Sequence, residues 1–485
     1  MRESQLALIA EGRAWTFAAL RAEAHRVAQR LAAFGVRPGD RVGMLLPNVP
    51  HAVFLIHAVQ QLGAVLVPLN LRLTSAELLA QAQRVRLRCL VHNTATAPQA
   101  SALAEIAPLL DIDAETPSAP FCAQKRTLEA LHTLMFTSGT TGQPKAAMLT
   151  WGNHFWSAIA SGWRLGVHPE DRWLLNLPLY HVGGLAIVLR AALYGIPIVL
   201  HSRFDPEMVL WALARDRVTI LSLVPTMLKR LLDFNRDRPL PEHVRVVLVG
   251  GAVTPAPLLA RALEARVPVA LTYGLTEAAS QVATATPDQV RAQRNNGVGY
   301  PLRGVHVRIA DADGAPLPPE ALGEVWVRGP IVMRGYWDDP EATARTLTLD
   351  GWLRTGDLGY CDARGQLWVV QRRTDLIISG GENIYPAEVE AVLLQHPEVE
   401  AACVVGVEDA EWGQRVVALV QRVPGAAVRA EALQAFCRKR LAGYKCPRAV
   451  LFVDALPLTA SGKVDRKAAQ AWATQAIAER EAMQS

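Results

Sequence analysis

The stretch Thr137-Ser138-Gly139-Thr140-Thr141-Gly142-Gln143-Pro144-Lys145 directly follows the apolar run Leu131–Phe136. It contains four hydroxyl side chains, two glycines and a lysine. Glycine lets a backbone approach a phosphate closely, hydroxyls donate hydrogen bonds, and lysine adds positive charge. The spacing does not fit a Walker A loop, and the chain has no G-x-G-x-x-G dinucleotide turn. An apolar strand followed by this loop predicts a phosphate-binding site, although a polar surface loop can have the same composition.

The segments before this loop alternate between helix and strand patterns. Thr16 can cap a helix that ends at Gly35, and the short strand Arg41–Leu46 follows it. Thr74 and Glu77 have the spacing of a capping box at the start of a further helix. Such alternation predicts parallel sheets covered by helices.

The alternation is interrupted at residues 93–128, which we expect to form a loose surface connection with at most one helix. It returns from residue 131 in five strand patterns, at 131–136, 196–200, 218–224, 244–248 and 267–271. From Val305 to about Val370, short β runs separated by Gly, Asp and Pro turns predict an antiparallel subdomain. The tail after Arg373 has the size of a compact α+β domain.

A chain of 485 residues is too long for one hydrophobic core. We therefore predict the α/β class with two domains. Residues 1–373 would form a large N-terminal domain of parallel α/β subdomains plus a smaller β-rich subdomain. Residues 374–485 would form a small, mobile α+β C-terminal domain.

Composition excludes several other classes. The net charge is +5, and no Lys/Arg run is long enough to indicate nucleic-acid binding. The six cysteines are scattered without a C-x-x-C pair, which favours reduced thiols. Neither a signal peptide nor about 18 uninterrupted apolar residues are present. We expect a cytoplasmic protein without a membrane span, and homo-oligomerisation is left open.

Further segments accompany the phosphate loop in a fixed order. With them the chain resembles, over nearly its whole length, the acyl-CoA synthetases and related adenylate-forming enzymes. The matching segments are Leu177-Pro178-Leu179-Tyr180-His181, Tyr273-Gly274-Leu275-Thr276-Glu277, Thr355-Gly356-Asp357, Arg372-Arg373-Thr374-Asp375 and Ser461-Gly462-Lys463.

The resemblance implies a reaction in two halves, with ATP, Mg²⁺ and coenzyme A. A carboxylate attacks the α-phosphate of ATP, and a thiol then displaces AMP. Lys463 would reach between the carboxylate and the α-phosphate, and Glu277 with Thr141 would bind Mg²⁺, which prefers oxygen ligands. The nucleotide-binding residues implied by the resemblance are Thr137, Ser138, Gly139, Thr140, Thr141, Gly142, Lys145, Tyr273, Gly274, Thr276, Asp357 and Arg372. Asp357 and Arg372 would hold the ribose, because a carboxylate accepts from two hydroxyls.

The same resemblance gives roles to residues around the acyl and thiol groups. His181 would border the carboxylate pocket, and Thr374 would be the hinge of a rotating C-terminal domain. Gly380 and Gly381 would approach the entering thiol. Four residues lie in segments that line the acyl pocket of relatives: Ser222, Thr226, Ser280 and Gln281. Ordinary packing or capping explains any one of these four residues equally well, and a tight turn is the alternative for Gly380 and Gly381. A lone lysine, histidine or carboxylate is often a surface side chain.

A narrower resemblance points to ligases that make o-succinylbenzoyl-CoA for menaquinone synthesis. It rests on Gly152–His154, Asp171–Leu174, Val199–His201 and the run Leu376–Glu390. This substrate has a second, aromatic carboxylate, which needs donors or a counter-charge when buried. Three alternatives stay open: another fatty or aryl acid, transfer to a carrier-protein phosphopantetheine, and a non-catalytic nucleotide-binding relative. Gln143 and Ala146 depart from the Lys and Gly often found beside the loop lysine, and the chain begins later than most relatives.

Overall fold

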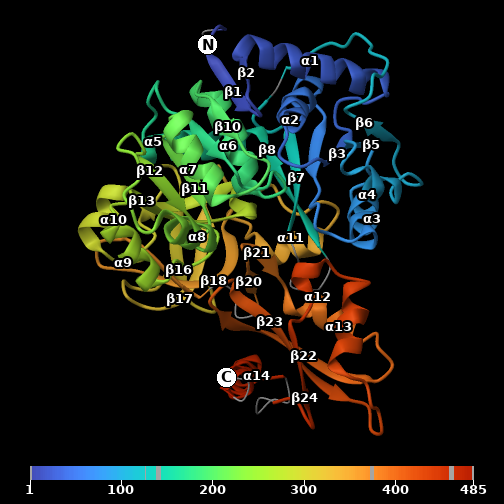
Figure 1. Cartoon of the computed structure of the whole chain (residues 1–485), viewed down its shortest axis with the longest axis vertical. Coiled ribbons are helices and arrows are strands. Elements are labelled where there is room, and N and C mark those ends of the chain that lie inside the picture. The colour runs from blue at the N-terminus through green and yellow to red at the C-terminus, as the bar shows by residue number, and fades with distance from the viewer. Residues whose placement is uncertain (1–2, 126, 138–143, 372–375, 458–463, 483–485) are drawn as a thin grey trace. The chain divides into compact units, whose positions relative to one another are not determined.

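The computed structural model describes residues 3–125, 127–137, 144–371, 376–457 and 464–482. The chain divides into two compact units, which are described separately (Figure 1). Unit 1 consists of residues 1–71, 81–136 and 146–371, and unit 2 of residues 72–80, 137–145 and 372–485. The domain boundary predicted at 373/374 lies outside the described residues, so its position stays a prediction.

The larger sheet of unit 1, sheet A, has the strand order β15-β14-β13-β12-β11-β9-β10-β1-β2. Neighbours from β13 to β1 pair in parallel, whereas β14, β15 and β2 pair antiparallel at the two edges. The strands are β1 (Leu6–Ala10), β2 (Arg13–Thr16), β9 (Trp173–Leu175), β10 (Ile198–Leu200), β11 (Ile220–Leu223), β12 (Val246–Val249), β13 (Val269–Leu275), β14 (Ser280–Ala285) and β15 (Tyr300–Pro301).

Sheet B of unit 1 has the order β6-β5-β3-β4-β7-β8, and the pairs from β6 to β7 are parallel. Its strands are β3 (Arg41–Leu45), β4 (Val65–Pro68), β5 (Cys89–His92), β6 (Leu109–Asp111), β7 (Leu131–Thr137) and β8 (Lys145–Thr150). Two parallel sheets with intervening helices confirm the predicted α/β class.

Helices connect the strands of both sheets. They are α1 (Phe17–Ala33), α2 (Pro50–Leu62), α3 (Ser75–Arg84), α4 (Ala97–Ser101), α5 (Trp151–Leu165), α6 (Val182–Tyr194), α7 (Pro206–Arg215), α8 (Pro225–Asn235), α9 (Ala256–Glu264) and α10 (Pro287–Gln293), with the short 3-10 helix η1 (Thr276–Ala278); α11 (Pro340–Thr346) instead lies between two strands of the β-rich subdomain. The predicted caps are present: the Thr16 hydroxyl accepts from Ala19 N, and Thr74 and Glu77 form reciprocal bonds. These caps satisfy N–H groups that have no partner inside the helix.

Two hydrophobic clusters cover the faces of sheet A. One contains side chains of α1, α2 and α6 together with strands of sheets A and B. The other packs α7, α8, α9 and α10 against the opposite face of sheet A. Because both faces are covered, the parallel strands are almost completely apolar, as expected for this type of sheet.

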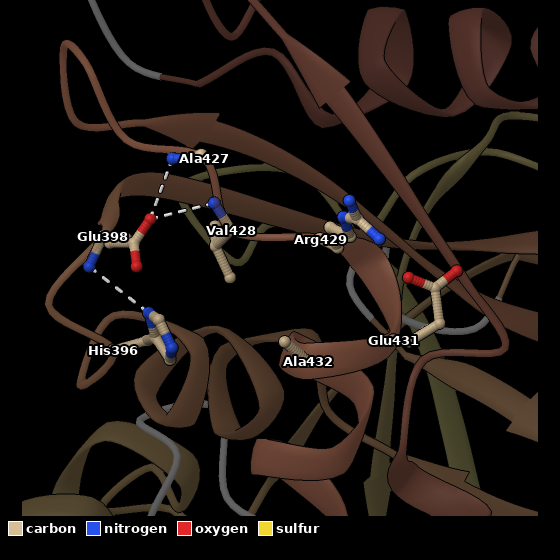
Figure 2. A pocket seen from close by; sticks show the side chains of 7 residues that line it. All are labelled: His396, Glu398, Ala427, Val428, Arg429, Glu431 and Ala432. Atoms are coloured by element: carbon tan, nitrogen blue, oxygen red, sulfur yellow. Dashed lines mark hydrogen bonds between the residues drawn. The ribbon is translucent and has the colours of Figure 1, made fainter.

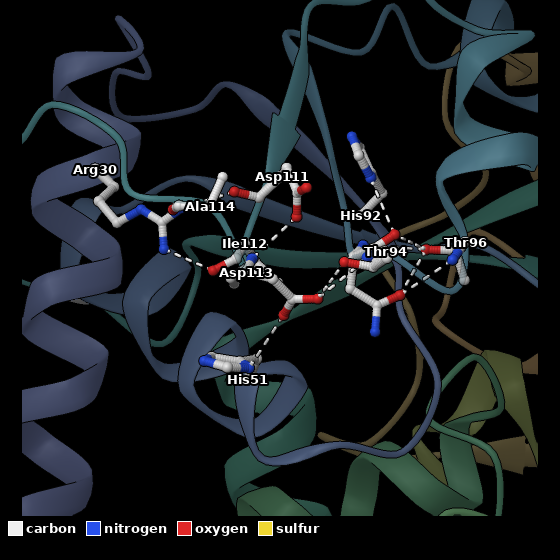
Figure 3. Close-up of polar contacts among 10 residues, drawn as sticks. Arg30, His51, His92, Thr94, Thr96, Asp111, Ile112, Asp113 and Ala114 are labelled. Carbon is white, nitrogen blue, oxygen red and sulfur yellow. Dashed lines mark hydrogen bonds and ion pairs between the residues drawn. The ribbon is translucent and has the colours of Figure 1, made fainter.

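The connection at residues 93–128 is more ordered than predicted. It contains α4 and the edge strand β6, and Arg30 of α1 donates to the backbone carbonyls of Asp111 and Ala114, both at 2.7 Å (Figure 3). Asp113 accepts from Thr94 at 3.1 Å and lies 3.7 Å from the His51 ring. A three-residue edge strand held by one arginine has little sequence pattern of its own.

The β-rich subdomain is a four-stranded sheet with antiparallel pairing throughout, as predicted. Its strands are β16 (His306–Ala310), β17 (Gly323–Arg328), β18 (Leu353–Cys361) and β19 (Leu367–Gln371). The sequence did not indicate β18, whose first half contains the polar Thr355-Gly356-Asp357 segment.

In unit 2 a sheet of order β21-β20-β23-β22, with β24 on β23, is covered on both faces. Helices α12 (Pro386–Leu393) and α13 (Ala430–Arg438) pack on one face, and α14 (Arg466–Ala482) packs on the other. The strands are β20 (Ile377–Ser379), β21 (Glu382–Ile384), β22 (Val399–Asp409), β23 (Gly413–Arg422) and β24 (Ala449–Val453), with η2 (Gly443–Lys445) before β24.

Unit 2 also has a pocket of about 650 Å³ beside the first turn of α13. Figure 2 shows the Glu398 carboxylate accepting from the backbone N–H groups of Ala427 (2.9 Å) and Val428 (2.8 Å). This carboxylate therefore fixes the loop that precedes α13. Within the described part of the chain, no helix combines the length and apolar character that crossing a membrane requires.

Candidate active site

The predicted phosphate loop, Thr137–Lys145, begins at the end of β7. Thr137 is the last residue of β7, and residues 138–143 lie outside the described residues. Lys145 is the first residue of β8 and is 9% exposed. The predicted strand before the loop is thus confirmed, whereas the contacts of Ser138, Gly139, Thr140, Thr141 and Gly142 stay predictions.

Two segments predicted to bind the nucleotide meet within unit 1. The Tyr273 hydroxyl at the end of β13 donates to the Asp357 carboxylate on β18 over 2.6 Å. Both side chains are buried. A phenol that donates to a carboxylate makes a charge-assisted hydrogen bond, which fixes the carboxylate in one orientation.

The backbone around Asp357 is fixed by its own segment. The Thr355 hydroxyl donates to Val325 O (2.5 Å) and accepts from Asp357 N (3.1 Å). Gly356 has a φ of 75°, and its N–H donates to Glu324 (2.7 Å). The Thr-Gly-Asp order therefore holds an acidic side chain at a bend within β18.

Glu277 lies on η1, directly after β13, where it accepts from the Tyr336 hydroxyl over 2.8 Å. Backbone bonds join the segment of Tyr336 to β8, from Trp337 N to Ala146 O (2.8 Å) and from Met148 N to Gly335 O (2.9 Å). Tyr336 was missed by the sequence analysis, because only this pairing brings it to Glu277.

The donor set around Glu277 fits a magnesium ion bound mainly through phosphate. Among the residues that the structure describes, no three His, Cys, Asp or Glu side chains are grouped to hold a metal on their own. Mg²⁺ commonly keeps several waters and takes one or two carboxylates plus substrate phosphates. A single carboxylate such as Glu277 therefore matches what the protein contributes to a site of this kind.

The hairpin of β13 and β14 contains two of the predicted acyl-pocket residues. Ser280 has a φ of 101°, and a Cβ on Gly274 would lie 1.8 Å from Ser280 O, so only glycine fits opposite it. The amide nitrogen of Gln281 contacts the hydroxyls of Thr272 (3.4 Å) and Thr284 (3.3 Å). Gln281 is 2% exposed, so it supports the hairpin.

The other pocket candidates come from neighbouring parallel strands and helices. Ser222 on β11 accepts from the Trp173 indole over 3.0 Å, and Thr226 lies in the first turn of α8. His181 precedes α6, and its ring meets Tyr180 edge-on at 4.8 Å. Ser222 thus has a hydrogen-bond partner within the core, and the acyl-pocket roles of Ser222, Thr226 and His181 stay predictions.

A buried cation near the same hairpin was also missed. Arg190 on α6 is 3% exposed, and it donates to the Ser157 hydroxyl over 3.1 Å. Ser157 in turn donates to Ala279 O (2.7 Å), one residue before Ser280. Burial lowers the pKa of Arg190, and within the described residues its guanidinium forms no ion pair and its Nε has no hydrogen-bond partner. A buried guanidinium without a carboxylate calls for an anion.

Comparison with known proteins identifies the family. The family described as AMP-binding enzyme matches residues 2–337, and the AMP-binding enzyme C-terminal domain matches residues 388–463. The chain belongs to the AMP-binding enzyme family. This confirms the resemblance to adenylate-forming enzymes.

Relatives of this AMP-binding enzyme include 2-succinylbenzoate–CoA ligases. The chain is 43% identical to the 2-succinylbenzoate–CoA ligase of Geobacillus kaustophilus over 458 residues, which cover 93% of this chain and 92% of the relative. The fold of this chain matches an o-succinylbenzoate CoA synthetase double mutant from Bacillus subtilis bound to a product analogue, with a TM-score of 0.92 and 40% identity. The match covers 96% of this chain and 95% of the mutant. The Bacillus subtilis enzyme in complex with ATP and magnesium gives a TM-score of 0.75 at 40% identity, with coverage of 96% and 97%.

The glycine pair predicted on the thiol side of this AMP-binding enzyme forms a tight turn. Ser379 pairs with Glu382, and Gly380 and Gly381 between them have φ angles of 59° and 85°. A Cβ on Gly380 would lie 2.9 Å from the Trp412 ring. The turn that was weighed as the alternative is therefore present, and a role toward the thiol stays a prediction. Arg372, Thr374 and Lys463 lie outside the described residues.

Proposed function

We propose that the chain is an AMP-forming ligase that converts 2-succinylbenzoate to its CoA thioester through an acyl-adenylate, in menaquinone biosynthesis. The observation that carries the proposal is the 43% identity to a 2-succinylbenzoate–CoA ligase across 93% of this chain. ATP, Mg²⁺ and coenzyme A are its cofactor and co-substrates, in agreement with the ATP and magnesium complex of the Bacillus subtilis enzyme.

The first half-reaction joins two anions, a carboxylate and the α-phosphate. Catalysis therefore depends on charge neutralisation and alignment, and little proton transfer is needed. In the proposal, Lys463 neutralises the carboxylate and the α-phosphate, and the loop from Thr137 to Lys145 holds the phosphates. Glu277, with the Thr141 hydroxyl, supplies oxygen ligands to the magnesium ion.

Asp357 binds the ribose hydroxyls in the proposal, supported by Arg372. The hydrogen bond from Tyr273 supports this role, because it fixes the orientation of the buried carboxylate. Tyr273, Gly274 and Thr276 would lie against the adenine, next to the magnesium ligand.

The ring carboxylate distinguishes 2-succinylbenzoate from simple acids. We propose that Arg190 balances this charge. Support comes from its burial, from the lack of a carboxylate partner among the residues that the structure describes, and from the Arg190–Ser157–Ala279 contacts, which connect it to the Ser280 segment. His181, Ser222, Thr226, Ser280 and Gln281 would then line the rest of the acyl pocket, with the packing contacts above as the competing explanation for each.

In the second half-reaction, the C-terminal domain of residues 374–485 would rotate about Thr374 relative to residues 1–373. Gly380 and Gly381 would then approach the entering thiol, and their lack of side chains supports such an approach. The proposal also places the enzyme in the cytoplasm, which the six free cysteines support.

A substrate panel tests the assignment. Pure enzyme with ATP, Mg²⁺ and coenzyme A is assayed for AMP release with 2-succinylbenzoate, benzoate, and medium-chain fatty acids. The expected result is that 2-succinylbenzoate has the highest kcat/KM. A higher kcat/KM for any other acid overturns the narrow assignment, and transfer to a carrier-protein phosphopantetheine in preference to coenzyme A overturns the thioester product. No pyrophosphate exchange with any acid would mean a non-catalytic nucleotide-binding protein.

A further inference from the structure

A polar pocket in unit 1 lies at the edge of sheet A where the parallel strands begin. Its volume is about 570 Å³, within the range of small-molecule sites. Lining residues directly precede three neighbouring strands: Arg172 before β9, Thr219 before β11 and Arg245 before β12. The acyl-pocket candidates His181 and Thr226 follow the carboxyl ends of β9 and β11, so this pocket is at the opposite edge of the sheet.

The floor of the pocket is a buried ion pair. Asp171, which is 1% exposed, accepts two bonds from the Arg245 guanidinium, at 2.7 and 2.5 Å, and one from Thr219 at 2.8 Å. Arg245 also donates to the carbonyls of Leu165 and Gly166. These contacts lower the pKa of Asp171 despite the opposing effect of burial. The pair is therefore self-neutralised and gives the pocket a rigid base.

Outside the Asp171–Arg245 pair, the positive charge of the pocket comes from Arg172 and Arg217. Arg172 is held by a bond from its Nη1 to Asp216 O over 2.8 Å, and Arg217 is an exposed residue with a φ of 51°. Neither arginine forms an ion pair with a residue that the structure describes. Apart from Asp171 and Arg245, the charged lining residues are Arg172, Arg217 and Glu170, so two arginines stand against one glutamate, and His168 and His243 add further polar groups.

We propose that this pocket binds a small dianionic oxyanion, of the phosphate or dicarboxylate class, between Arg172 and Arg217. A guanidinium presents several N–H donors in a plane that matches phosphate and carboxylate oxygens. Arg172, held by its bond to Asp216 O, supplies a preorganised donor, and the exposed Arg217 lines the same pocket. The proposal does not depend on the proposed function, because none of its residues belongs to the candidate active site.

The probe is radiolabelled inorganic phosphate in equilibrium dialysis with the full chain. Saturating α,β-methylene-ATP and Mg²⁺ keep the nucleotide site occupied, so the label reports on other sites. The expected result is one further phosphate per chain, about tenfold weaker binding in Arg217→Ala and in Arg172→Ala, and tighter binding in Glu170→Gln. Unlabelled succinate as a competitor distinguishes the two ligand classes. If succinate displaces the labelled phosphate, the pocket binds dianions in general, and if it does not, the pocket is specific for phosphate.

Arg215→Ala is the matched control, since Arg215 stacks on Trp211 at 4.4 Å and does not line the pocket. It should bind phosphate like the parent chain. The inference is overturned if the saturated enzyme binds no label, or if Arg217→Ala and Arg172→Ala bind it as tightly as Arg215→Ala does. Melting temperatures of all variants show whether any loss comes from unfolding.

Discussion

The Tyr273 hydroxyl donates to the Asp357 carboxylate over 2.6 Å, although 84 residues separate the two in the chain. This contact joins the end of a strand in sheet A to the β-rich subdomain, and both belong to unit 1. The carboxylate has a fixed direction before any nucleotide arrives. Preorganised groups of this kind lower the cost of binding.

Asp357→Asn should therefore weaken the use of ATP strongly. The amide keeps the volume but loses the charge, and hydrogen bonds to charged groups contribute about 1.5–3 kcal/mol. We expect the KM for ATP to rise by about 10–100-fold, with a smaller change in the KM for the acid. Tyr273→Phe should raise the KM for ATP by less than Asp357→Asn does. An unchanged ATP dependence in Asp357→Asn would contradict the ribose role.

Lys463→Ala should separate the two half-reactions. Loss of the lysine should nearly abolish adenylate formation, measured by pyrophosphate exchange, because the charge between the carboxylate and the α-phosphate is removed. Thioester formation from supplied acyl-adenylate should be spared. Lys467→Ala removes an exposed lysine nearby and serves as the control. Equal loss of both half-reactions would argue against the proposed role.

Local sequence signals predicted the parts of the fold that depend on neighbouring residues. The Thr16 cap, the Thr74–Glu77 capping box and the strand before the phosphate loop are all present. Each depends on hydrogen bonds or periodicity within a few residues. Strands β6 and β18 were missed, because one is very short and the other contains Thr355-Gly356-Asp357.

The missed site residues depend on contacts between distant segments. Tyr336 reaches Glu277 only because its segment pairs with β8, and no motif indicates this pairing. Arg190 lies in an otherwise apolar helix, where a single arginine normally indicates an exposed position. Its burial is decided by how α6 packs, which sequence periodicity alone does not give.

Glu277→Gln should change the magnesium requirement. The amide can still accept from the Tyr336 hydroxyl, so the local structure should persist, but a charged oxygen ligand is lost. We expect the Mg²⁺ concentration for half-maximal pyrophosphate exchange to rise about tenfold or more. Tyr336→Phe keeps the Glu277 carboxylate and should raise this Mg²⁺ concentration less than Glu277→Gln does. If both variants give the parent's Mg²⁺ titration curve, Glu277 is not a metal ligand.

Arg190→Met should discriminate between two acids. The variant keeps an unbranched apolar stem but removes the buried charge. We expect kcat/KM for 2-succinylbenzoate to fall by about 100-fold, whereas 4-oxo-4-phenylbutanoate, which lacks the ring carboxylate, should lose little. The ratio of the two values is the measurement, because misfolding would lower both. An unchanged ratio would assign Arg190 a packing role alone.

His154 makes stability depend on pH. Its Nε2 lies 2.7 Å from the Thr133 hydroxyl, and burial, with a contribution from Arg190, lowers its pKa to about 3. An unfolded histidine has a pKa of about 6.5, so between these values the unfolded chain binds a proton that the folded chain excludes. Stability from this group is complete above about pH 6.5 and is lost as the pH falls toward 3, by at most about 1.4 kcal/mol per pH unit.

His154→Gln should be less stable than the parent at pH 7.5 but should lose less stability on acidification. The melting temperature is measured at pH 7.5 and at pH 5.5, and the difference between the two temperatures is compared between the parent and each variant. His168→Gln replaces an exposed histidine and should reproduce the parent's difference. If His154→Gln also reproduces it, another buried group controls acid unfolding. A reduced difference confined to His154→Gln assigns the effect to a neutral imidazole that must take up a proton when the surrounding core opens.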